Sequence, residues 1–188
     1  AGLVLLALTM SNRTYQPMEE PQSPLSYLKQ LATAPILKLY SAVFCMFFCF
    51  AALLNYLPFI LQDTFLITNT RDIGFIYSGY LLGALFSITA PSVLKRGRSP
   101  WHLLCGVFAF YCITIILLMS EELLVFLIAF TGFCAAMFMI HSTAAPLVNK
   151  LSVAPASVTN GGYVSFYYSG GALGSFVPGL VYQQYGHT

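Results

Sequence analysis

Few side chains inside the long apolar stretches of this sequence can take part in chemistry, and His141 is the foremost of them. It is the only histidine deep within such a stretch, and Ser142 and Thr143 follow it directly. A buried imidazole titrates near neutral pH, so it can relay a proton or bind a substrate. The structural alternative is a hydrogen bond to a neighbouring helix. His141 and Ser142 do not form a base and nucleophile pair, because adjacent residues on a helix do not face each other.

The last apolar stretch gathers aromatic and small residues on one side of the helix that it predicts, because they recur every three or four residues. These residues are Tyr163, Tyr167, Gly170, Gly174 and Pro178. Small residues at this spacing let two helices come close, which drives association where lipid removes the hydrophobic effect. Gly79 and Gly83 make a second such face. Packing alone explains the glycines, whereas the tyrosines also suit a cavity wall.

Other chemistries find little support in the residues. There is no metal-binding pair, no Gly-x-Ser-x-Gly and no pair of carboxylates within an apolar stretch, so we expect no catalytic residue, no metal and no cofactor, and no enzyme. The five cysteines lie inside apolar stretches, without the spacing of a zinc site or a disulfide framework. A net charge of +2 is too small to indicate a nucleic-acid partner.

The elements that carry these residues are predicted by the charges, which are confined to short intervals. Five uncharged stretches separate them, at residues 39–62, 73–94, 99–120, 123–149 and 151–188. Each is long enough to cross a membrane, because about 20 helical residues span a hydrocarbon core of ~30 Å. Charged residues make up 7% of the chain, against about a quarter in soluble domains. We therefore predict an all-α, polytopic membrane bundle surrounded by lipid.

The signs of the charges predict how the bundle is oriented. Seven of the eight Lys and Arg residues fall in alternate intervals, and the positive-inside rule places those intervals in the cytoplasm. The chain then enters the cytoplasm near residue 10, crosses five times and ends outside. Local signals mark helix starts: Ser99 as a cap before Pro100, and Ser120 as a cap before Glu121 and Glu122.

A resemblance arises from two segments. Residues 161–186 look like the eleventh helix of the major facilitator superfamily, most similar to twelve-helix bacterial drug and sugar efflux permeases. The turn at residues 95–98 resembles the family motif Gly-x-x-x-Asp-Arg-x-Gly-Arg-Arg, which Lys95, Gly97 and Arg98 match. Ala90 and Leu94 replace the first Gly and the acid. Two interpretations follow: a charge-based latch, as in the family, or positive anchors that only set topology.

The resemblance covers nearly the whole chain and implies the carboxy-terminal half of a transporter. Residues 1–9 would end helix six, residues 10–35 would be the cytoplasmic central loop, and residues 36–188 would hold helices seven to eleven, truncated before the last. In the family, helices eight and eleven pack against the opposite half, so the two glycine faces would lack their partners here. Packing within this half is the alternative.

The resemblance also implies a function: secondary transport across the bacterial inner membrane, as proton-coupled efflux of a small molecule by alternating access, together with the missing amino-terminal half. Helices seven, eight, ten and eleven line the path in the family, so Asn55, Tyr77, His141 and Tyr167 are expected to contact the substrate. Since no Asp or Glu lies within a stretch, a coupling carboxylate would belong to the other half. The alternative is a polytopic membrane protein that does not transport, such as an intramembrane enzyme or a sensor's anchor domain.

Overall fold

The structure is a computed structural model that describes residues 23–88 and 99–185, and within these ranges every regular element is a helix. The helices are α2 (Pro24–Leu31), α3 (Ala34–Phe65), α4 (Thr70–Ile76), α5 (Ser78–Ser87), α7 (Pro100–Leu117), α8 (Leu123–Leu151) and α9 (Ala156–Tyr185). The helix end expected at residues 1–9 lies outside the described residues, as do Lys95, Gly97 and Arg98. The connector expected at residues 10–35 contains α2 and the first residues of α3.

Three of these helices are long and apolar enough to cross a bilayer: α3, α7 and α8. They indicate a membrane protein, as the uncharged stretches predicted. Helix α9 is also long, at 30 residues, but its glycines, serines and tyrosines make it less apolar. The stretch at residues 73–94 is described as two shorter helices up to Ser87, α4 and α5.

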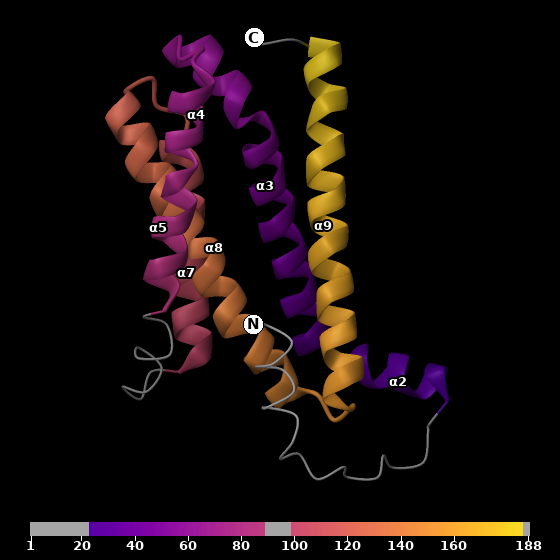
Figure 1. The fold of residues 1–188 in the computed structure, drawn as a ribbon. Helices are drawn as coiled ribbons and strands as arrows, with labels where there is room; N and C mark the ends of the chain where they lie inside the picture. The colour runs from indigo at the N-terminus through magenta and orange to yellow at the C-terminus, as the bar shows by residue number, and fades with distance from the viewer. Residues whose placement is uncertain (1–22, 89–98, 186–188) are drawn as a thin grey trace, which may run out of the picture.

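Helix α8 is the centre of the bundle, because α3, α5, α7 and α9 all contact it. Its buried side chains run from Phe126 near its start to Val148 near its end. The largest contact of the fold joins α3 to α9, and Figure 1 shows these two helices side by side, with α4, α5 and α7 on the other side of α8. Short helix α2 packs against α9 at one end.

Close contacts between backbones explain why glycines lie where these helices meet. A Cβ atom on Gly170 or Gly174 would overlap the carbonyl oxygens of Phe44 and Phe48 on α3. A Cβ atom on Gly83 of α5 would lie 2.6 Å from the Cβ of Cys134 and 2.7 Å from the backbone nitrogen of Ala135, both on α8. Both glycine faces therefore meet a helix of this same chain, rather than lacking partners as the resemblance implied.

A Cβ atom on Gly79, the other glycine of the α5 face, would come within 3.1 Å of side-chain atoms of Phe130 and Thr131. These neighbours are side chains and not backbone, so the contact is looser than at Gly83. Gly79 thus shares the α5–α8 interface with Gly83, one turn nearer the start of α5.

The helix ends follow the predicted signals in part. Ser99 is the N-cap of α7, with proline in the first turn, as expected. The cap expected at Ser120 is wrong: α8 has Glu122 as its N-cap, and the Ser120 hydroxyl instead accepts a hydrogen bond from the backbone nitrogen of Glu122 at 3.1 Å. A turn of two residues after Ser120 therefore separates the hydroxyl from the helix that it was expected to cap.

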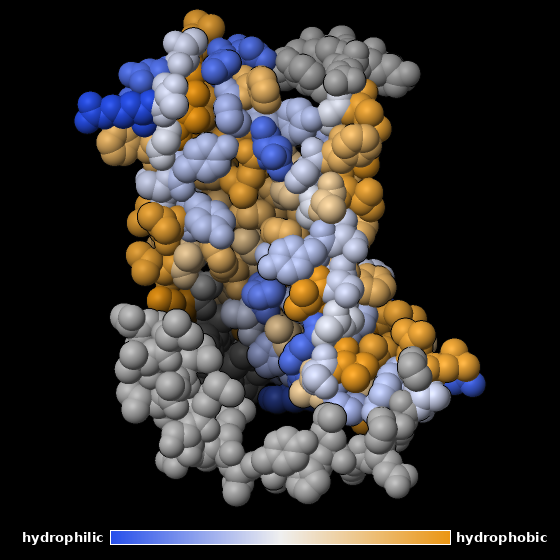
Figure 2. Space-filling model, turned by 45° about the vertical axis from the view of Figure 1, so that its right-hand side comes forward, coloured by the Kyte–Doolittle hydropathy of each residue, from blue (hydrophilic) through white to orange (hydrophobic). Residues whose placement is uncertain are grey.

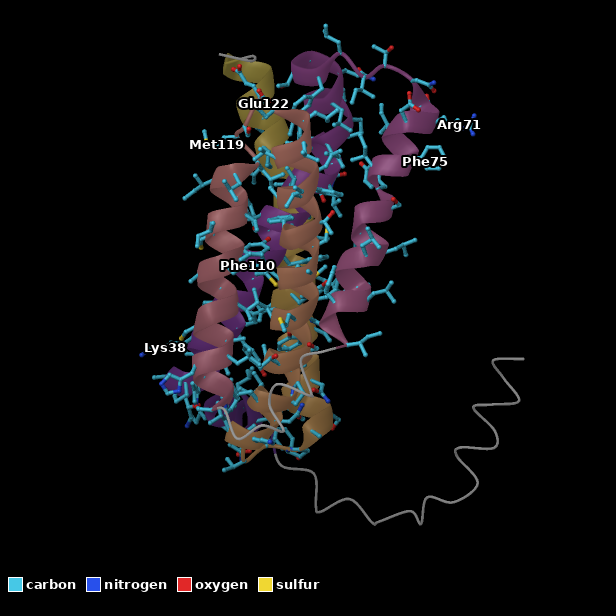
Figure 3. The ribbon with its side chains drawn as sticks, turned by 90° about the vertical axis from the view of Figure 1, so that its left-hand side faces the viewer. Lys38, Arg71, Phe75, Phe110, Met119 and Glu122 are labelled. Atoms are coloured by element: carbon cyan, nitrogen blue, oxygen red, sulfur yellow. The ribbon has the colours of Figure 1, made fainter. Side chains whose placement is uncertain are left out.

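The charges that the structure describes separate between the two ends of the bundle. Lys38 lies at one end and Arg71 and Glu122 at the other (Figure 3). Two further charges are placed by the direction of the chain, because α3 and α8 run from one end of the bundle to the other. Lys150 at the end of α8 lies at the same end as Lys38, and Asp63 near the end of α3 lies at the opposite end. The alternation read along the sequence is thus a separation in space.

Candidate functional site

A cavity of about 530 Å³ opens among α3, α5, α8 and α9, at the place where α4 and α5 meet. Its wall comprises Phe47, Phe50, Ala51, Leu54, Asn55, Tyr77, Tyr80, Met137, Tyr167 and Tyr168. Three of the four expected substrate contacts are therefore brought together from segments far apart in the sequence: Asn55, Tyr77 and Tyr167. Figure 2 shows pale and blue, less hydrophobic residues gathered along the middle of one face, with orange apolar residues on both sides.

Asn55 is held across the α3–α9 interface. Its amide nitrogen donates to the carbonyl oxygen of Ala51 at 2.7 Å and to the hydroxyl of Ser175 on α9 at 3.0 Å. The side chain is exposed at the cavity. Its nitrogen is thus engaged in positioning, and its carbonyl oxygen is the atom that a bound molecule can use as an acceptor.

Tyr77 reaches from the junction of α4 and α5 to α3. Its hydroxyl donates to the carbonyl oxygen of Leu54 at 2.8 Å. Pro58 lies four residues after Leu54 and has no N–H, so this carbonyl loses its usual helical donor. Tyr77 replaces that donor, which gives it a structural role beside its place in the cavity wall.

The same residue interrupts the helix predicted at residues 73–94. Tyr77 ends α4, and the turn that follows is tightened, with the backbone nitrogen of Tyr80 donating to the carbonyl oxygen of Tyr77 at 3.0 Å. The Ser78 hydroxyl bonds to the carbonyl oxygen of Phe75. Tyr77 and Tyr80 are three residues apart, so they share one side of this segment, and both line the cavity.

Tyr167 is half-buried in an aromatic cluster. Its ring stacks on Phe47 of α3, with centroids 3.8 Å apart and planes inclined by 13°. Tyr168 meets it edge-on at 5.2 Å, and the His141 ring lies 5.0 Å away. The α3–α9 interface thus fixes the orientation of this ring at the cavity wall.

His141 lies beside the cavity and does not line it. Its Nδ1 atom is 3.0 Å from the hydroxyl of Tyr163, which is only 2% exposed. The histidine joins α8 to α9 through this hydrogen bond and touches the cavity wall through Tyr167. This geometry is compatible with both interpretations of the sequence: His141 makes a hydrogen bond between helices, and its imidazole lies next to the expected site.

The sequence reasoning missed Phe47, Phe50 and Met137. A signal for the first existed: Phe47, Ala51 and Asn55 are spaced by four residues and share one face of a helix. Met137 on α8 carries no such signal, because the crossing of α8 with α3 is decided by packing over the whole bundle. Among the described residues, no group of three or more His, Cys, Asp or Glu side chains is placed to hold a metal ion.

The cavity is therefore an uncharged, largely aromatic site with a few hydrogen-bonding groups. Among the residues that the structure describes, no Asp, Glu, Lys or Arg contributes to its wall. Two other hollows are more uniformly apolar: one of about 400 Å³ bordered by α3, α7, α8 and α9, and one of about 590 Å³ bordered by α5, α7 and α8. Comparison with known families, curated proteins and solved structures finds no match to this chain.

Proposed function

We propose that this chain is the carboxy-terminal half of a secondary transporter of the major facilitator type, which exports a small molecule across the bacterial inner membrane by alternating access. The observation that carries the proposal is the aromatic and polar cavity in an otherwise apolar bundle. Such groups are costly in lipid and are typical of substrate pathways. In this assignment α3, α4 with α5, α8 and α9 correspond to helices seven, eight, ten and eleven.

The span count belongs to the same proposal. Helix α9 has 30 residues, which at 1.5 Å each gives a length of about 45 Å, more than a bilayer core requires. Helices α4 and α5 follow one another with only Tyr77 between them, so together they act as one interrupted span. Interrupted helices are common in transporters, where irregular backbone borders a cavity.

The partner in this proposal is an amino-terminal half that closes the open side of the cavity. Transport would be coupled to protons, and His141 is an ionisable group placed to take part, since it touches the wall through Tyr167. A coupling carboxylate, where one is used, would come from the partner half.

A transport assay tests the proposal. The complete gene product is reconstituted in proteoliposomes, and uptake of candidate solutes is measured with and without a pH gradient. Saturable transport that depends on the gradient is expected. Rapid conduction independent of the gradient would point to a channel and overturn the carrier mechanism.

The alternative, a polytopic membrane protein that does not transport, has one observation in its favour. Both glycine faces find their partners within this chain, at α3 and α8, so neither requires an opposite half. Absence of any solute flux from the complete protein, together with an unchanged bundle, would support this second function.

A further inference from the structure

The hydrogen-bonding groups left unused in the cavity are mainly donors. Tyr80, Tyr167 and Tyr168 line it, and their hydroxyls have no hydrogen-bond partner in the part of the chain that the structure describes. A phenolic hydroxyl is a better donor than acceptor, because the ring withdraws electron density from its oxygen. The hydroxyl proton of Tyr77 and the amide nitrogen of Asn55 are already engaged. The wall residues therefore carry three unused hydroxyl donors and one unused amide oxygen, that of Asn55.

Two aromatic rings of the wall, those of Phe47 and Tyr167, cover each other's faces. Their centroids are 3.8 Å apart, and their planes are inclined by 13°. Phe50 lies between Phe47, at 6.0 Å, and Phe133, at 5.5 Å, with planes within 17° of each other. Ring edges carry partial positive charge and ring faces partial negative charge. The ring edges and the tyrosine hydroxyls of the wall both attract electron-rich groups of a bound molecule.

No described residue of the wall carries a charge that would neutralise the charge of an ionic ligand. A cation would need a carboxylate, and an anion would need Lys or Arg; neither type is among the described residues of the wall. An ion that enters therefore loses its hydration without gaining an opposite charge. A neutral molecule avoids this loss, and its ring gains contact with the aromatic wall.

We propose that this cavity binds uncharged aromatic compounds that carry a hydrogen-bond acceptor, such as an amide, ester or ketone carbonyl, and discriminates against their charged analogues. The inference rests on the proposed function in so far as the bound compound is the transported one. The carbonyl accepts from the tyrosine hydroxyls, and the ring packs beside Phe50 and Tyr167.

Binding to the complete gene product in lipid nanodiscs tests this, with empty nanodiscs as the background for partitioning into lipid. The probes share one ring: N,N-dimethylbenzamide is neutral with an acceptor, isopropylbenzene lacks the acceptor, benzoate is an anion and benzyltrimethylammonium is a cation. Titration calorimetry should show that the amide binds at least about 10-fold more tightly than either ion. Equal or tighter binding of an ion, or no binding of the amide, would overturn the inference.

Variants locate the bound amide in the cavity. Tyr167→Phe and Tyr168→Phe each remove one hydroxyl and keep the ring, so each should weaken binding of the amide by about 3- to 10-fold. Neither should change any binding of isopropylbenzene. Tyr111→Phe is the matched control, because its hydroxyl bonds to the carbonyl oxygen of Met46 away from the cavity wall. Equal losses in all three variants would place the amide elsewhere.

The outcomes separate this inference from the proposed function. Selective binding of the amide without any transport by the complete protein would retain the site and reject the transporter. Gradient-dependent transport of an ionic solute with no preference for the amide would retain the transporter and reject the selectivity.

Discussion

At the scale of single residues, Tyr77 supplies a hydrogen bond that Pro58 removes from α3. Proline inside α3 leaves the Leu54 carbonyl without its helical donor, and lipid offers no water to replace it. The Tyr77 hydroxyl supplies the missing bond at 2.8 Å. The residue expected to contact substrate therefore also joins α3 to the break between α4 and α5.

This pairing gives a double-variant test. Tyr77→Phe should lower the free energy of unfolding by about 1 kcal/mol, because it leaves the Leu54 carbonyl unsatisfied. In the background of Pro58→Ala, which restores the N–H, the same change should cost much less. Thermal unfolding in detergent measures both, and Tyr80→Phe is the control, since that hydroxyl has no partner among the described residues. Equal costs in the two backgrounds would contradict the pairing.

His141 is the second residue whose role is open to a direct test. If it carries coupling, His141→Gln should abolish accumulation driven by a pH gradient and leave substrate binding unchanged, because glutamine can hydrogen-bond but does not titrate. The Nδ1 atom lies 3.0 Å from the Tyr163 hydroxyl, so Tyr163→Phe serves as a control that removes the bond and keeps the imidazole. Accumulation that survives His141→Gln would reduce the histidine to a packing residue.

At the scale of elements, the contact of α9 with α3 depends on the absence of side chains. Gly170 and Gly174 lie directly against the carbonyl oxygens of Phe44 and Phe48, which are backbone atoms and cannot rotate away. Gly161, on the same helix, has nothing within 4 Å of its hypothetical Cβ. One helix therefore offers both a crowded and an open glycine.

Alanine at these positions should act in opposite directions. Gly161→Ala should raise the free energy of unfolding by about 0.5–1 kcal/mol, the usual gain of alanine over glycine in a helix. Gly174→Ala should lower it by about 1–3 kcal/mol, because the added methyl group forces α9 away from α3. Thermal unfolding of both variants in detergent measures the difference, and a stabilising effect at Gly174 would show that the two helices do not approach so closely.

How far the sequence predicts these elements depends on whether the signal is local. The start of α7 follows from Ser99 and Pro100, because a cap acts on neighbouring residues. The start of α8 does not follow from Ser120, since Glu121 and Glu122 extend a turn before the helix begins. The glycine faces were visible as spacing, but their partners, α3 and α8, depend on how whole helices pack. Asn55, Tyr77 and Tyr167 met in one cavity, whereas Met137 carried no signal of its own.

At the scale of the whole molecule, the charges of the described residues divide between two ends. Lys38 and Lys150 lie at one end, and all the described acidic residues lie at the other. The positive-inside rule predicts that the lysine end faces the cytoplasm, and this orientation remains a prediction. The cavity lies between the two ends of the bundle, and in the proposed transporter this position is within the membrane.

Two loop residues that are almost equally exposed can report this orientation. Met119, before α8, is 82% exposed at the acidic end, and Val153, after α8, is 83% exposed at the lysine end. In a background with the five cysteines replaced by alanine, Met119→Cys should react with a membrane-impermeant maleimide in intact spheroplasts, and Val153→Cys should not. In inverted vesicles the reactivities should exchange, because the opposite face is then outside.

Other outcomes of this labelling are equally informative about the fold. Reaction of both cysteines from one side would mean that α8 does not cross the bilayer, which would remove the basis for a central helix bordering a transmembrane path. Reaction in the reverse sense would mean that the chain is inverted, with Lys38 and Lys150 outside. Replacing Glu121 and Glu122 by lysine then provides a causal test, because added positive charge at the outer end should shift part of the population to the inverted labelling pattern.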